Sequence, residues 1–324
     1  MKIKENQPVI KDGNEIEFPK EVGIYPILIK NNSRNILTTF LTDNRDWVDQ
    51  NLLEYGAMLF RGFEVEGSEG FNNLLPFIFE EEIEYKQRTS PRHTVVGNVY
   101  TSTDYPNNQK IHMHTESSYS ALWANRICFY ANVVSNIGGQ TPIADVRKVM
   151  DSLDASIIKK FEEKGVMYIR NIQTGVGMTW KEIYQVESKI ELEEMLDKTK
   201  VKYSWIGDDS LRISWVRPAL QKHPATNETV WFNHAYFYSK HLLDDFILEV
   251  ISEDDLPFLS FYGDGSEIEK DVIEAIKEAY EQNLILFKWE KNDVLLLDNM
   301  LFAHGRMPYE GERQILVAMG NPLS

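Results

Sequence analysis

The sequence predicts a mainly β fold with surrounding helices, arranged as a double-sheet jelly roll, or double-stranded β-helix, with helical insertions. Many short apolar segments of similar length are separated by glycine, proline and polar residues, a pattern typical of strands joined by turns. Candidate metal ligands, namely His114, Glu116 and His304, lie near two segments that are far apart in the chain. Because a jelly roll places distant strands side by side, this spacing favours that fold.

The expected strands and helices follow from the period of the apolar residues. The expected strands cover residues 25–30, 56–63, 95–103, 126–134, 166–170, 211–215, 229–235, 284–287, 293–298 and 314–319. The expected helices cover residues 43–54, 68–80, 145–153, 156–164 and 267–283. The last helix is amphipathic, because Ile268, Val272, Ile276 and Tyr280 share one face.

The chain shows no internal repeat, low-complexity tract or long linker that would mark a domain boundary. We therefore expect one domain over residues 1–324. Residues 165–230 combine a few strand-like segments with polar helical stretches rich in Glu and Lys, which indicates an insertion into that domain.

The charge balance argues against nucleic acid and membranes as partners. The chain has 34 Lys and Arg against 50 Asp and Glu, a net charge of −16, which disfavours binding to polyanions. The N-terminus lacks the apolar core of a signal peptide and no run is long enough to span a bilayer, so we expect a cytoplasmic protein. The single cysteine, Cys128, excludes an intramolecular disulfide, and its apolar surroundings indicate a buried, inert thiol.

The segment around His114 carries the first two candidate ligands. In an extended strand, residues two apart point to the same face, so His114 and Glu116 would present an imidazole and a carboxylate together. His304, after a very apolar strand, offers the third ligand. Two His and one carboxylate on one face, with the other positions open, form the facial triad of non-heme Fe(II) oxygenases. His112 would share this face, and we expect it to line the pocket rather than bind the metal.

Several segments resemble, in the same order, those of the taurine-dioxygenase and clavaminate-synthase-like Fe(II)/2-oxoglutarate-dependent oxygenases. They are His114-Thr115-Glu116, the stretch GGQTPIAD at 138–145, VWFN at 230–233, DNMLFAHGR at 298–306 and Gly311-Glu312-Arg313. The resemblance covers about residues 55–320, and its ordered pieces are far more specific than the His-x-Glu pair alone. One detail departs from the commoner pattern, since Glu116 stands where Asp is more frequent.

The resemblance implies a dioxygenase that uses Fe(II), 2-oxoglutarate and O₂, with the two histidines and Glu116 as iron ligands. It implies that Arg313 binds the far carboxylate of 2-oxoglutarate, because arginine forms a bidentate pair that lysine cannot. Thr141 would donate its hydroxyl to the same carboxylate, and Arg306 is the alternative arginine. The expected outcome is hydroxylation, or desaturation or cyclisation after the same hydrogen abstraction. Halogenation is not expected, because related halogenases carry a small residue in place of the carboxylate ligand.

The same resemblance implies that residues before the triad, together with the insertion at 165–230, contribute to the substrate side. The candidate substrate contacts are Arg88, Asn98, Tyr100, Ser102, His112 and Asn233. The pattern looks most like the branch that hydroxylates an amino acid, either free or tethered to a carrier protein, in natural-product biosynthesis. A small-molecule substrate is therefore expected, and a homo-oligomer is compatible with this interpretation.

Two alternative functions would use the same ligands. Zinc accepts two His and one carboxylate, but zinc hydrolases usually carry His-Glu-x-x-His on a helix, which this sequence lacks. A non-catalytic metal-binding jelly roll that acts as a sensor would leave Arg313 and Thr141 with no ligand to hold. The three functions differ in their response to 2-oxoglutarate, and the sequence leaves the two alternatives open.

Overall fold

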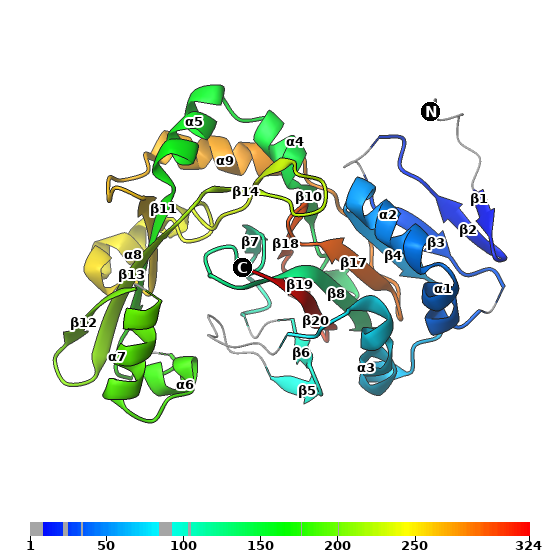
Figure 1. Cartoon of the computed structure of the whole chain (residues 1–324), viewed down its shortest axis with the longest axis horizontal. Helices are drawn as coiled ribbons and strands as arrows, with labels where there is room; N and C mark the ends of the chain where they lie inside the picture. The colour runs from blue at the N-terminus through cyan, green and yellow to red at the C-terminus, as the bar shows by residue number, and fades with distance from the viewer. Residues whose placement is uncertain are drawn as a thin grey trace.

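The structure is a computed structural model that describes residues 9–21, 25–33, 35–83, 93–102, 105–175, 177–199 and 201–324. Within this part of the chain nine strands form the largest sheet, called the large sheet below (Figure 1). In spatial order they are β1 (Val9–Lys11), β2 (Asn14–Glu17), β3 (Ile27–Lys30), β4 (Ala57–Arg61), β17 (Val294–Asp298), β8 (Trp123–Val133), β20 (Gln314–Leu323), β6 (Val99–Thr101) and β5 (Thr94–Val96). Neighbouring strands are antiparallel except β3 and β4, which run parallel.

A second, small sheet carries most of the candidate metal site. It consists of β10 (Ile143–Asp145), β18 (Phe302–Arg306) and β7 (Ile111–His114), all antiparallel. Two short pairs flank it, β14 (Leu220–Lys222) with β15 (Thr229–Trp231) and β9 (Ile137–Gly138) with β19 (Tyr309–Glu310). Together, the large and small sheets make the double-sheet fold that the sequence predicts.

Alternate residues of the large sheet pack into two different cores, because successive side chains of a strand point to opposite faces. Leu295 and Leu297 of β17 join the core shared with the small sheet, whereas Val294 and Leu296 pack in the core that contains the N-terminal helices. These helices are α1 (Leu37–Asp43), α2 (Arg45–Tyr55) and α3 (Gly67–Ile78), on the right in Figure 1. Burial on both faces explains why the central strands are continuous apolar runs.

A third sheet, called the outer sheet, lies on the left in Figure 1. Its spatial order is β12 (Lys202–Ile206), β13 (Ser210–Arg217), β11 (Val166–Ile172) and β16 (Phe258–Tyr262), all antiparallel. The first three come from the expected insertion at 165–230, and β16 comes from beyond it. The remaining helices are α4 (Val146–Asp151), α5 (Ala155–Lys164), α6 (Trp180–Tyr184), α7 (Lys189–Lys198), α8 (Asp245–Val250), α9 (Lys270–Gln282) and the 3-10 turns η1 (Lys240–Leu242) and η2 (Glu253–Asp255).

Two expected strands are interrupted or cut short by turns. Residues 95–103 include parts of a hairpin of β5 and β6 instead of one strand, because the chain turns at Gly97, where φ is +51°. The strand expected at 229–235 ends at Trp231. It ends there because the side-chain oxygen of Asn233 accepts a hydrogen bond from the amide two residues further on and closes a turn.

Two further differences from the predicted strands depend on which segments find a partner strand. The apolar run at 284–287 makes only an isolated bridge, between Ile285 and Ile143. In contrast, β18 forms across His304 and Gly305, where no strand was expected, because β7 and β10 pair with its two edges. Helix α1 was also not expected.

The structure bears on two expectations, a buried Cys128 and the lack of a membrane-spanning segment. Cys128 is fully buried in β8, and burial raises the pKa of its thiol, so it stays protonated and inert. No helix in the described ranges is both long enough and apolar enough to cross a bilayer.

Candidate active site

The three candidate metal ligands come together where β7 and β18 pair. These antiparallel strands place His304 opposite His114, and Glu116 follows the end of β7. One ligand atom from each of the three side chains lies within 4.8 Å of the other two. The group therefore has a spacing that one ion could bridge, and its members are the residues that the sequence singled out.

Gly305 allows the two ligand-bearing strands to approach this closely. A Cβ atom at this position would lie 2.6 Å from the carbonyl oxygen of Ile111, which is closer than real Cβ atoms come. The pairing also shifts register between His304 and Arg306. A larger residue at 305 would push β18 away from β7 and separate His304 from His114.

A backbone hydrogen bond fixes the tautomer of His114. Its Nδ1 lies 2.8 Å from the carbonyl oxygen of His112. A carbonyl oxygen can only accept, so Nδ1 carries the proton and Nε2 holds the free lone pair. This arrangement is usual for an imidazole that binds a metal through Nε2, so the donor set and its orientation fit a divalent cation.

The sequence predicted that Glu116 would lie on an extended strand. In the structure it reaches the site from a turn instead. Strand β7 ends at His114, and Ser117 adopts the left-handed region with φ +58°. The hydroxyl of Thr115 donates to that of Ser118 across 2.9 Å and closes the turn. The imidazole and the carboxylate still converge, but through turn geometry rather than through strand alternation.

The side chain of Asn299 holds the backbone of Glu116 in this turn. Its Oδ1 accepts a hydrogen bond from the Glu116 amide at 2.7 Å, and its Nδ2 donates to the Glu116 carbonyl oxygen at 2.9 Å. The same Nδ2 donates to the carbonyl oxygen of Ala124 at 2.8 Å. Asn299 is fully buried, so water does not compete for these bonds. Sequence reasoning missed this role, and the one available signal was a polar amide just after an apolar strand.

A buried pair fixes the chain next to Asn299. The Oδ1 of Asp298 accepts from the amide of Met300 at 2.9 Å, and its Oδ2 lies 3.0 Å from Nε2 of His223. The Nδ1 of His223 accepts two backbone amides of the following turn, so Nε2 is the donor to Asp298. His223 and Asp298 are both about 1% exposed, and they position the turn that presents Asn299.

Aromatic rings enclose the histidines of the site. The ring of Phe129, from the large sheet, lies 5.1 Å from that of His304, and the ring of Phe237 lies 4.6 Å from that of His114, measured between centroids. His234 is buried with its ring 5.8 Å from His114. Burial, and next the neighbouring His114, lower the pKa of His234 well below its ordinary value, so this ring is neutral at pH 7.

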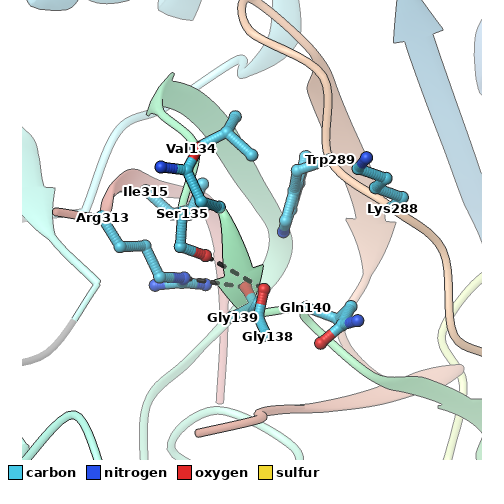
Figure 2. Close-up of a pocket in the computed structure, with 10 residues that line it drawn as sticks. Val134, Ser135, Gly138, Gly139, Gln140, Lys288, Trp289, Arg313 and Ile315 are labelled. Atoms are coloured by element: carbon cyan, nitrogen blue, oxygen red, sulfur yellow. Dashed lines mark hydrogen bonds between the residues drawn. The ribbon is translucent and has the colours of Figure 1, made fainter. Parts of the chain in front are cut away.

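Arg313 lines a small pocket of about 110 Å³ (Figure 2), and its guanidinium also contacts Thr141. The Arg313 Nε donates to the carbonyl oxygen of Gly139 at 2.8 Å, and one terminal nitrogen lies 3.4 Å from the Thr141 hydroxyl. The indole of Trp289 donates to the same hydroxyl at 3.1 Å. Thr141 is buried, and the residues on either side of it bond to the backbone of β18 or the residue after it. Thr141 therefore lies on a segment that is hydrogen-bonded along β18, the strand that carries His304, and Arg313 contacts Thr141 there.

Arg306 has a different set of partners. Its two terminal nitrogens donate to backbone carbonyl oxygens, to Tyr105 at 2.8 Å, to Gln109 at 2.9 Å and also to Pro106. Only 4% of the residue is exposed. Arg306 thus fastens the segment before β7 onto β18, and its terminal nitrogens are already engaged with the protein.

Four of the candidate substrate contacts fall at residues 88–102, before β7. Arg88 lies outside the described residues. Asn98 sits in the β5–β6 turn and donates to Glu82 at 2.8 Å, and Tyr100 is buried in the core between the sheets. The amide of Ser102 donates to a backbone carbonyl of β20. These bonds hold Asn98 and Ser102 to neighbouring parts of the large sheet.

The other two candidate contacts lie nearer the triad. His112 is half-buried, and its Nδ1 lies 3.1 Å from the hydroxyl of Tyr236. Asn233 is buried, and its Nδ2 donates to the carbonyl oxygen of Ala219 while its Oδ1 accepts from the amide of Ala235. Because both ends of this amide group bind the backbone, Asn233 has the contacts of a residue that shapes the wall next to His234.

Comparisons with known proteins agree with this geometry. Residues 34–319 match the family described as taurine catabolism dioxygenase TauD, TfdA family. The dapdiamide synthesis protein DdaC of Enterobacter agglomerans is 36% identical over 280 residues, which cover 85% of this chain and 85% of that protein. A clavaminate synthase-like protein of Arabidopsis thaliana is 26% identical over 294 residues, covering 88% and 87%.

Two solved structures share the fold. PvcB of Pseudomonas aeruginosa, described as an Fe, alpha-ketoglutarate dependent oxygenase from an isonitrile synthetic pathway, superposes with a TM-score of 0.56 at 11% identity, covering 98% of this chain and 94% of that one. AAD-2, solved with Mn(II) and N-oxalylglycine, gives a TM-score of 0.54 at 14% identity, covering 95% and 98%. At such low identity these structures speak for the fold alone.

The fold and site are those of a non-heme iron oxygenase that depends on 2-oxoglutarate. This chain belongs to the taurine catabolism dioxygenase TauD, TfdA family. It is thus a dioxygenase whose cofactor is Fe(II) and whose cosubstrates are 2-oxoglutarate and O₂. The alternatives of a zinc hydrolase and of a non-catalytic sensor are not supported by this membership.

Proposed function

We propose that this dioxygenase hydroxylates an unactivated C–H bond of a small molecule, namely an amino acid that is free or tethered to a carrier protein, in natural-product biosynthesis. The observation that carries the proposal is the convergence of His114, Glu116 and His304, with ligand atoms within 4.8 Å of one another. The substrate class is supported by the relative DdaC, which is named for dapdiamide synthesis.

In this proposal His114, Glu116 and His304 hold the iron on one face. The two imidazoles and one carboxylate leave the remaining coordination positions open for the keto acid and O₂. Iron bound there supplies the activation of O₂ that is coupled to decarboxylation of 2-oxoglutarate. The protein supplies the rest, because the Nδ1–H of His114 is fixed by a carbonyl and the backbone of Glu116 is fixed by Asn299.

Arg313 and Thr141 bind the far carboxylate of 2-oxoglutarate in this proposal. The Nε of Arg313 is anchored on Gly139, and one terminal nitrogen lies 3.4 Å from the Thr141 hydroxyl. Burial, and next the positive charge of Arg306, lower the pKa of Arg313 to about 10, so the guanidinium is still charged at pH 7. A desolvated cation of this kind gains from an incoming carboxylate. Arg306 is the weaker candidate, because its terminal nitrogens already bind three carbonyl oxygens.

We also assign the whole chain to one domain in which residues 165–230 contribute to the substrate side. Contacts between the outer sheet and the site support this assignment. The Tyr168 hydroxyl, on β11, accepts a hydrogen bond from the His234 amide at 2.9 Å, and the Trp215 indole, on β13, donates to the carbonyl oxygen of Tyr119 at 2.6 Å. Both contacted residues lie beside the triad.

One anaerobic experiment tests the iron and 2-oxoglutarate assignments together. The purified protein is loaded with Fe(II) and titrated with 2-oxoglutarate while the visible spectrum is recorded. A metal-to-ligand charge-transfer band is expected, and it should be absent in His304→Ala. A protein that binds iron without developing the band on addition of 2-oxoglutarate would contradict the assignment of this site.

A second experiment addresses the substrate. A panel of free amino acids and of the same amino acids on a carrier protein is incubated with Fe(II), 2-oxoglutarate and O₂, and the products are read by mass spectrometry. The expected result is a gain of one oxygen atom in at least one amino acid, in step with succinate release. If only other compound classes gain oxygen, the amino acid assignment is wrong.

A further inference from the structure

A second pocket, of about 70 Å³, lies between the outer sheet, helix α7 and the turn that follows Glu116. Its lining includes Tyr119 from this turn, Leu196 from α7, and Ile213 and Trp215 from β13. It shares no lining residue with the Arg313 pocket. The molecule therefore has a separate, largely apolar and aromatic hollow on the side covered by the outer sheet.

Two arginines face this hollow from one side of the outer sheet. Arg170 on β11 pairs with Ile213 on β13, and Arg217 on β13 pairs with Val166 on β11. Since alternate residues share a face, both arginines and Trp215 point to the same side of the sheet. Both line the pocket, and no acidic residue appears in its lining among the described residues.

Of the two arginines, Arg217 has a buried donor that can bind an anion. Its Nε is buried and has no hydrogen-bond partner among the described residues. Burial lowers the pKa of Arg217, and the electrostatic interaction with Tyr168 raises it. Arg170 is buried, and its guanidinium lies 5.1 Å from the ring centre of Phe258. A buried cationic donor without an anion is costly, and a carboxylate would satisfy it.

Two aromatic side chains in contact with each other link the wall of the pocket to the candidate iron site. Tyr119 lines the pocket, and its ring lies 4.8 Å from the ring of His234. His234 in turn lies 5.8 Å from His114. The rings of Tyr119 and His234 therefore separate the pocket from His114, so the pocket lies two side chains away from the candidate iron site.

We propose that this pocket is the anchoring subsite for a free carboxylate of the substrate, with Arg217 as the main partner and the apolar body of the substrate along Ile213 and Trp215. Arg170 adds positive charge at the other end of the same face. The inference rests on the proposed function and narrows it. A carrier-bound amino acid has lost its carboxylate to the thioester, so this subsite favours the free acid, and an apolar or aromatic one.

The test uses matched probes on the full-length enzyme loaded with Fe(II) and 2-oxoglutarate under anaerobic conditions. L-Leucine and L-phenylalanine are each compared with their carboxamides and their pantetheine thioesters by isothermal titration calorimetry. We expect at least one acid to bind, about tenfold or more tighter than its carboxamide and its thioester, because only the acid can form the charge-assisted pair. If neither acid binds, or if the amide or thioester binds as tightly, the proposal is overturned.

Variants on one strand separate the anchor from a general effect of charge. Arg217→Gln should weaken binding of the acid about tenfold or more without changing that of the carboxamide, and Arg217→Lys should recover part of the loss. The control is Arg212→Gln, which removes an arginine from the opposite face of β13, where it pairs with Asp254 at 2.9 Å. An equal loss in Arg212→Gln, or none in Arg217→Gln, would overturn the assignment.

The charge-transfer band, recorded on the same samples, keeps the two proposals distinguishable. A normal band without any preference for the acid rejects the carboxylate subsite and leaves the proposed iron site intact. Preference for the acid without a band supports the subsite and rejects the iron and 2-oxoglutarate assignments. The band also shows whether each variant has folded.

Discussion

Asn299 binds both the amide and the carbonyl group of Glu116 through one side chain. The backbone of Glu116, the proposed carboxylate ligand, is therefore held at both its amide and its carbonyl group by Asn299. Asn299 lies 183 positions further along the chain, between β17 and β18. An amide group is suited to this task because it offers a donor and an acceptor in one plane.

The first prediction follows from this contact. Asn299→Ala leaves the amide and carbonyl of Glu116 and the carbonyl of Ala124 without their partner, so the free energy of unfolding should fall by about 2–4 kcal/mol. Fe(II) affinity should also fall about 10–100-fold, as expected for loss of a group that orients a ligand. Thermal unfolding and an iron titration measure the two effects.

A matched variant separates positioning from stability. Asn283 makes a similar set of side-chain bonds, to Ser152 at 2.9 Å and to the carbonyl oxygen of Ala279 at 2.8 Å, at the end of α9. Asn283→Ala should lower stability without changing iron affinity. If both variants lose iron in proportion to their stability, Asn299 has no specific role at the site.

The second prediction concerns Arg313, the arginine proposed to bind 2-oxoglutarate. Arg313→Lys keeps the charge but loses the planar fork, so 2-oxoglutarate affinity should fall about tenfold or more, roughly 1.4 kcal/mol, while iron stays bound. Titration of the charge-transfer band measures this affinity. Arg306→Lys should instead lower stability, since three carbonyl oxygens lose a donor. The reverse pattern would identify Arg306 as the partner of the cosubstrate.

The third prediction concerns His304. His304→Ala removes one of the three proposed ligands, and iron affinity should drop by about 100-fold or more with loss of turnover. His241→Ala is a suitable control, because His241 lies beside Glu267 and away from the group of ligands. Retention of near-normal activity in His304→Ala would require another ligand.

The fourth prediction concerns the reaction outcome at high chloride. In the proposed site Glu116 would fill the position that halogenases of this family leave vacant, and its backbone is tied to Asn299, so a halide should not displace it easily. The wild-type enzyme should form oxygenated product in step with succinate and no chlorinated product. Detection of a chlorinated product by mass spectrometry would show that Glu116 does not occupy a coordination position.

Much of the large sheet was predictable because its strands are buried on both faces. Such strands are continuous apolar runs, as in β17 and β8, and these two runs were assigned correctly to within a few residues. The apolar run at 284–287 gave the same signal but found only one partner, at Ile143. Apolarity reports burial, and pairing depends on which edges the rest of the fold leaves free.

The candidate site was predictable in composition but not in local geometry. His114 and His304 were recognised because their residue types and neighbouring segments are distinctive. The turn at Glu116 was not, because it depends on a left-handed Ser117 and on Asn299, and neither contact follows from residues close in sequence. Long-range polar contacts of this kind leave almost no local pattern.

Arg306 ties the segment at 105–109 to the strand that carries His304. The approach to β7 is thus fastened by a side chain as well as by strand pairing, and the conformational entropy of bringing His114 to His304 is lost when the chain folds. A metal that enters a site assembled in this way does not have to order the chain. We therefore expect ligand substitution to govern the exchange rate of the ion, and the apoprotein to take up divalent ions without refolding.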